Sequence, residues 1–294
     1  MEVKDYLKDY FSVYSELINT GMKTVSAILA IDQESNKAIE LPPILLFRHI
    51  LELADGLSEL YSKECVLASI PISRTLIEAF FQLDYMLSSK DKFENKSYAY
   101  LYAVQKKRLL QYERFLQEAS KGFSQRLKKD KYLKGKFEME ADEVEEFKKH
   151  IALYKSNISQ ETFSIFREKE FKENDYWYKL LLNSNKIEVI TEHLEKQALY
   201  EFYYRKLSRF LHANDIIDYY VVSRDEYRHI KALRQYPHDV NELIETNLYF
   251  LASSIRVFLS FFIDKYPDIT VYKDEVTRSY NKLKSMVVKI NIED

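Results

Sequence analysis

The sequence LIETNLYFLASSIRVFLSFFI, residues 243–263, is the stretch that decides the fold. Its apolar residues are dense enough to surround most of a helix, which predicts a helix over 241–265 at the centre of a core. The most apolar part, residues 248–263, is interrupted by Arg256 and is too short to span a bilayer comfortably. We therefore expect a buried helix rather than a membrane segment.

Further helices are expected on both sides of this stretch. Apolar residues recur at helical spacing over 3–31, 44–62, 66–88, 92–120 and 272–290. The chain has 4 glycines and 5 prolines, fewer than a turn-rich β architecture needs. The sequence therefore predicts an all-α fold, a single multi-helix bundle with short links.

A charged region interrupts the apolar pattern in the middle of the chain. A basic stretch over 126–136 is followed at once by an acidic stretch over 138–146. This order favours an inserted helical hairpin of complementary charge, although solvated helix faces give the same pattern. We expect one helical domain, 1–294, with a core at about 1–120 and 195–290 and a charged insertion at about 121–194.

Composition narrows the classes of function. The formal net charge of −2 argues against a non-specific nucleic-acid coat but leaves room for a local basic patch, and no feature is specific for DNA. Cys65 is the only cysteine, so neither an internal disulfide nor a thiolate zinc site can form. The N-terminus is charged from its second residue, unlike a signal peptide, so we expect a cytoplasmic protein without membrane association.

The first candidate site is on the predicted helix 199–215, LYEFYYRKLSRFLHAND. At about 100° per residue, Arg205 and His212 lie about 20° apart on the helical wheel. The same side carries no carboxylate; its members are Tyr204, Arg205, Ser208, Arg209 and His212. This combination suits the binding of an anion or the transfer of a proton, although a helix with an opposite apolar arc can also present such a face to water.

A second candidate is the pair Arg74 and Glu78 in SRTLIEAFF. Residues four apart share a helix face, and a buried arginine needs a partner. The pair is either a structural ion pair or part of a cleft that also contains His212. Arg48 and His49 are weaker candidates on the preceding helix.

Known catalytic signatures are missing from the sequence. It contains no glycine-rich phosphate loop, no HExxH helix and no GxSxG elbow. We therefore expect no cofactor and no metal ligands, and the remaining chemistry is a metal-free acid/base or anion-binding site.

Two segments together resemble a bacterial family called domain of unknown function 5677. That family pairs an Arg-(Ser/Thr)-Leu-x-Glu helix with a downstream Tyr-x3-Ser-x3-His helix. The matching positions here are Arg74, Thr75, Leu76 and Glu78, then Tyr204, Ser208 and His212. The resemblance covers about 45–90 and 195–265 and leaves out the charged region.

The second segment also resembles the HEPN superfamily, whose signature is an arginine, four to six residues, and a histidine. Arg205 and His212 fit this spacing, but Lys206 stands where Asn, Asp or His is usual. The resemblance implies a HEPN-like all-α core, often dimeric, in bacterial toxin or phage-defence systems. Many such proteins are metal-independent endoribonucleases.

Three hypotheses follow. In the leading one, the chain cleaves RNA, with His212 as general acid or base, Arg205 stabilising the phosphate, and Tyr204 and Ser208 positioning the backbone. A homodimer would supply a second histidine.

In the main rival hypothesis, the same face binds a nucleotide, RNA or a partner protein without cleavage. In the third, the polar residues form a structural network with Arg74 and Glu78.

Overall fold

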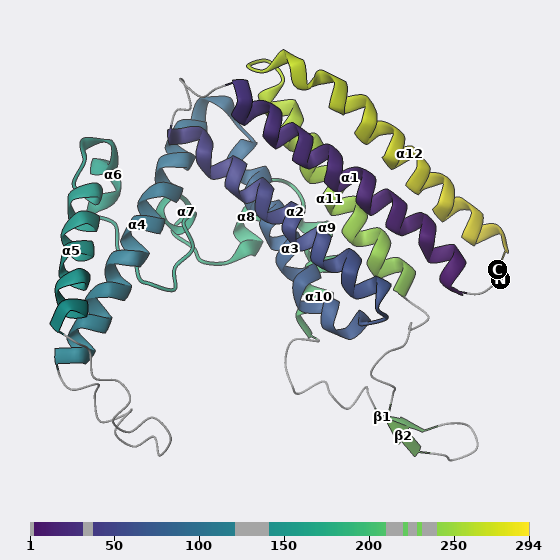
Figure 1. Ribbon diagram of the computed structural model, residues 1–294, viewed down its shortest axis with the longest axis horizontal. Helices are drawn as coiled ribbons and strands as arrows, with labels where there is room; N and C mark the ends of the chain where they lie inside the picture. Colours follow the sequence, from purple (N-terminus) through teal and green to yellow (C-terminus); the bar gives the residue numbers. More distant parts are fainter. Residues whose placement is uncertain are drawn as a thin grey trace. The chain divides into compact units, whose positions relative to one another are not determined.

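A computed structural model describes residues 3–31, 38–120, 141–209, 220–222, 228–230 and 240–293 (Figure 1). Helices make up nearly all of these ranges, so the predicted all-α fold class is confirmed. The strands within them are β1 (Tyr220–Val222) and β2 (Arg228–Ile230), an antiparallel pair with Val221 opposite His229. The chain divides into two compact units, residues 1–91 with 187–294 and residues 92–186.

The first unit is built around five long helices (Figure 1). They are α1 (Val3–Ile31), α2 (Leu41–Ser62), α3 (Val66–Leu87), α11 (Val240–Phe262) and α12 (Thr270–Glu293). Helix α11 contacts each of the other four, which agrees with the central position predicted from its apolar sequence. Shorter elements of the unit include η1 (Ala38–Glu40), α8 (Ile187–His193) and η6 (Pro267–Ile269).

Aromatic rings fill the core around α11. Phe258 stacks on Phe47 with ring centroids 4.2 Å apart, and Phe250 meets Phe80 edge-on at 5.2 Å. Burying each such side chain contributes roughly 1.5–3 kcal/mol. Among the described residues, α3 alone is long and apolar enough to cross a membrane, but 56% of its most apolar window is buried inside the protein.

The second unit contains α4 (Lys90–Ser120), from Lys92 onward, and α5 (Ala141–Ile158). Leu109 of α4 forms a small core with Ile151 and Tyr154 of α5. The smaller elements η3 (Glu161–Phe163), α6 (Ser164–Arg167) and α7 (Lys179–Leu182) follow.

The limits of this unit differ from those predicted for the insertion. The sequence analysis placed 92–120 in the core and 187–194 in the insertion, whereas the compact units divide after residues 91 and 186. The reason is that α4 buries its apolar side chains against α5, which a charge pattern does not reveal. The basic stretch 126–136 lies outside the described residues.

Three consecutive elements occupy the first part of the predicted helix 199–215. They are α9 (Gln197–Leu199), the π-helix η4 (Tyr200–Tyr204) and α10 (Arg205–Arg209). A π-helical turn is wider than an α-helical one and frequently marks a functional site. Residues 210–215, including His212, lie outside the described part of the chain.

Candidate functional site

Arg74 of α3 is the centre of a polar cluster that joins α3 to η4 and α10. Its Nε donates a hydrogen bond to Ser208 Oγ at 3.0 Å, and its Nη2 donates to the Tyr204 hydroxyl. Its Nη1 lies 3.6 Å from Glu78 Oε2, the ion pair expected from the four-residue spacing. We call Arg74, Glu78, Tyr204 and Ser208 the Arg74 cluster.

Tyr204 bridges the two charged members of the cluster. Its hydroxyl accepts from Arg74 and donates to Glu78 Oε2 at 2.9 Å. The Arg74 guanidinium also lies 4.5 Å from the centroid of the Tyr204 ring, a cation–π contact. Because Tyr204 is only 5% exposed, its position is fixed by packing as well as by hydrogen bonds.

The local sequence explains how the cluster forms. Arg74 and Glu78 are four residues apart on α3, and Tyr204 and Ser208 are four apart on the opposing segment. Ser208 Oγ donates to the Tyr204 carbonyl at 3.0 Å, which orients the oxygen that accepts from Arg74. Two pairs with the same spacing thus meet across one interface, since α3 contacts both η4 and α10.

The cluster remains partly open to solvent. The side chain of Arg74 is 28% exposed and that of Glu78 is 12% exposed. A guanidinium has five N–H donors, and two of those on Arg74 are used in hydrogen bonds within the cluster. The third nitrogen, Nη1, faces Glu78, so the guanidinium is held on all three nitrogens and remains partly exposed.

Arg205 does not take part in the Arg74 cluster. Its Nη1 pairs with Glu201 Oε2 at 2.9 Å, and its side chain is 62% exposed. The hydrogen bond to Glu201 raises the pKa of Arg205 above its ordinary value. The next residue, Lys206, donates a hydrogen bond to Glu242 of α11 at 2.9 Å.

The side chain of Arg209 and the whole of His212 lie outside the described residues. The predicted Arg205–His212 pair therefore stays a prediction.

Tyr200 belongs beside this cluster, and the sequence analysis missed it. Its ring stacks on Tyr204 with centroids 5.4 Å apart. Burial raises the pKa of Tyr200 most, and Glu188 raises it further, whereas Arg205 and Arg74 lower it. The hydroxyl is therefore within electrostatic range of both arginines. The signal was available, because Tyr200 extends the four-residue spacing of Tyr204 and Ser208 by one step.

In the part of the chain that the structure describes, no three His, Cys, Asp or Glu side chains are grouped so that they could hold a metal ion. What the described residues bring together is an arginine, a carboxylate and two hydroxyl groups.

Comparison with known proteins places this arrangement in a family. The profile of a family described as "Family of unknown function (DUF5677)" matches residues 40–229, which is well over half of the chain. The chain belongs to this family. The DUF5677 match covers all four members of the Arg74 cluster. Neither the curated proteins nor the solved structures include a match to this chain.

Proposed function

We propose that this DUF5677 protein is a HEPN-like helical module that binds the phosphate backbone of RNA at the Arg74 cluster. The observation that carries the proposal is the fixed, partly exposed guanidinium of Arg74, held by Ser208 and Tyr204. Arginine suits phosphate because its planar donors match two oxygens at once. A side chain already held in place loses little conformational freedom when a phosphate arrives.

The surrounding charges determine how strong such a site can be. Glu78 partly neutralises Arg74, and Glu188 and Glu201 lie close enough to Tyr200 to affect its pKa. Arg205 also acts on Tyr200, whose pKa its positive charge lowers. We therefore expect moderate affinity that depends on salt, since phosphate contacts release counterions.

Cleavage of the bound RNA is the second candidate function, and the position of Arg205 favours it. Its guanidinium is exposed and paired with Glu201 only across a solvent-accessible helix face, where a phosphate can replace the carboxylate at little cost. Arg205 would stabilise charge on the phosphate while His212 acts as general acid or base. A homodimer would bring together two histidines, and a toxin or phage-defence system would be the biological setting.

The test measures RNA binding and cleavage separately. Fluorescently labelled single-stranded RNA would be titrated with protein in a chelator, and binding followed by anisotropy. Arg74→Ala should weaken binding at least tenfold. Arg48→Ala is a matched control, because Arg48 forms an i,i+4 pair with Glu52 at 3.0 Å on α2, outside the cluster. Equal binding by wild type and Arg74→Ala would refute the proposal.

Gel analysis of the same reactions tests the cleavage step. If the chain is an endoribonuclease, wild type produces fragments, and Arg205→Ala and His212→Ala still bind RNA but do not cut it. Binding without fragments in wild type supports the non-catalytic module. If Arg74→Ala lowers stability and wild type binds no RNA or nucleotide, the cluster is a structural network.

A further inference from the structure

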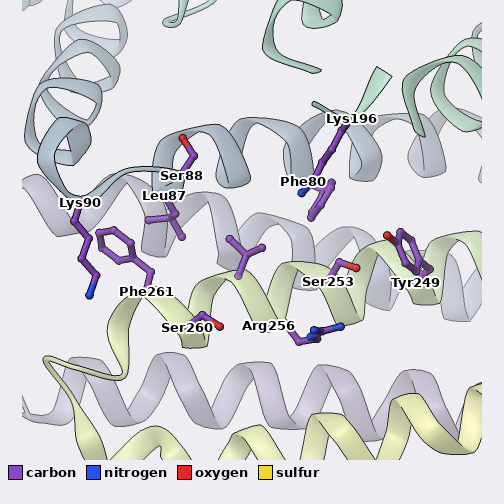
Figure 2. A pocket seen from close by; sticks show the side chains of 11 residues that line it. Phe80, Leu87, Ser88, Lys90, Lys196, Tyr249, Ser253, Arg256, Ser260 and Phe261 are labelled. Carbon is purple, nitrogen blue, oxygen red and sulfur yellow. The ribbon is translucent and has the colours of Figure 1, made fainter. Parts of the chain in front are cut away.

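A groove between α3 and α11 lies within the first unit and is separate from the Arg74 cluster (Figure 2). Its volume is about 510 Å³, which is within the range of small-molecule sites. Helix α11 supplies one wall and α3 supplies the other. Lys196, the residue directly before α9, also lines the groove. Figure 2 shows Arg256 on the α11 side and Lys196 across from it beside Phe80.

Among the described residues, the lining of the groove contains three cations and no carboxylate. The cations are Lys90, Lys196 and Arg256. Two of them have carboxylate partners outside the lining, Asp264 for Lys90 and Asp84 for Lys196. Arg256 is exposed, and no carboxylate among the described residues pairs with it. The cations therefore exceed their partners by one charge, and the uncompensated charge is on Arg256.

The lining residues of α11 form a single stripe along the groove. Tyr249, Ser253, Arg256 and Ser260 follow one another at spacings of four, three and four, which keeps them on one helix face. At about 1.5 Å per residue the stripe is about 16 Å long. Ser253 precedes Arg256 and Ser260 follows it along α11, so hydroxyl groups lie on this stripe before and after Arg256 (Figure 2).

The two ends of the groove differ in chemistry. Tyr249 lies at one end, whereas Lys90 and Phe261 lie at the other (Figure 2). Between them, Lys196 is held over the Phe80 ring, 5.2 Å from its centroid, and is hydrogen-bonded to Asp84. From Tyr249 the groove thus leads past Lys196 and Arg256, on opposite walls, to Lys90 at its far end.

We propose that this groove binds a nucleotide carrying two or three phosphates, with its base on Tyr249 and its phosphates running past Arg256 toward Lys90. An aromatic ring is a suitable stacking surface for a base. Arg256 supplies a planar set of donors that match phosphate oxygens, and the flanking serine hydroxyls can donate to the same oxygens. The length of the stripe is comparable to that of an extended nucleoside triphosphate. This site does not depend on RNA binding at the Arg74 cluster.

Isothermal titration calorimetry with ATP, pyrophosphate and adenosine tests the proposal. ATP should bind at least tenfold more tightly than adenosine, and pyrophosphate should compete with ATP. Arg256→Gln should weaken ATP binding at least tenfold. Arg278→Gln is the matched control, because Arg278 is also exposed but lies on α12 and does not line the groove. Arg278→Gln should bind ATP as wild type does.

Two further variants keep the result interpretable. Ser260→Asp places a carboxylate one helical turn from Arg256 and should also weaken ATP binding, whereas Arg74→Ala should not change it. Circular dichroism would verify that each variant is folded. The proposal is overturned if wild type does not bind ATP, if adenosine binds as tightly as ATP, or if folded Arg256→Gln and Ser260→Asp bind ATP as wild type does.

Discussion

Ser73 and Arg74 are neighbours on α3, yet they belong to two polar clusters of opposite character. Ser73 is completely buried, and Asn247 of α11 donates to its hydroxyl at 2.9 Å. The same amide donates to the Tyr61 hydroxyl of α2 at 2.7 Å. This Ser73 cluster (Tyr61, Ser73 and Asn247) contains no formal charge. The Arg74 cluster contains a charged pair and is partly open to solvent.

The difference follows from the cost of burying charge. A neutral hydrogen-bonded network can be sealed among helices, whereas a charged group loses far more solvation when it leaves water. Burial raises the pKa of Tyr61, which keeps that hydroxyl protonated as a donor and acceptor. The Ser73 cluster therefore holds α2, α3 and α11 together, whereas the charged Arg74 cluster stays partly in contact with solvent.

The largest expected effect is on stability, from Asn247→Ala. This change removes the two hydrogen bonds that Asn247 donates, to Tyr61 and to Ser73, and leaves a cavity at a position that is completely buried. We expect the free energy of unfolding to fall by about 2–3 kcal/mol. Urea denaturation measures it, and RNA affinity of the folded variant should stay the same. A loss below about 0.5 kcal/mol would mean that the Ser73 cluster does not stabilise the bundle.

Tyr204→Phe should have a smaller effect on stability and a visible effect on binding. The ring is kept, but the hydroxyl that links Arg74 and Glu78 is lost. We expect a loss of about 1 kcal/mol in urea denaturation. RNA affinity should fall several-fold because Arg74 is held less firmly. Tyr203→Phe, one residue away and outside the Arg74 cluster, is the control, and equal losses of RNA affinity in both variants would contradict the assigned role.

Arg205→Ala should leave stability unchanged. The side chain is exposed, and its pair with Glu201 is on a solvent-accessible helix face where ion pairs contribute little. The thermal midpoint should match that of wild type. A clear drop in the thermal midpoint would show that Arg205 stabilises the fold, which its exposed side chain does not predict.

The smallest effect concerns the titration of Tyr200. Its pKa is raised, so the folded form holds its proton longer than the unfolded form as the pH increases. Stability from this group is present below the ordinary pKa of about 10 and is lost as the pH rises through the folded value. Arg205→Ala should raise the pKa of Tyr200 further. Carbon-13 NMR of labelled tyrosine measures it, and a downward shift would contradict the geometry.

Much of the fold could be predicted because helical periodicity is a local signal. The expected helices 3–31, 66–88 and 92–120 correspond closely to α1, α3 and α4. The division between units could not be predicted, because it depends on which apolar face packs against which. Leu109 of α4, for example, packs against α5 in the second unit.

The candidate site was predicted in part. The spacing of Arg74 and Glu78 indicated their ion pair, which the structure contains. The pair of Arg205 with Glu201 has the same four-residue spacing and could have been predicted as well. Helical spacing could not reveal that Tyr204 and Ser208 meet Arg74, because tertiary contacts determine this. The groove between α3 and α11 was not predicted either, because Arg256 was interpreted only as an interruption of an apolar run.

The most direct test of the central claim compares RNA affinity across the two neighbouring clusters. Labelled single-stranded RNA would be titrated with wild type, Arg74→Ala and Asn247→Ala under conditions in which all three are folded. We predict that Arg74→Ala loses at least tenfold in affinity while Asn247→Ala binds as wild type does. Equal affinity for Arg74→Ala and wild type would contradict the account.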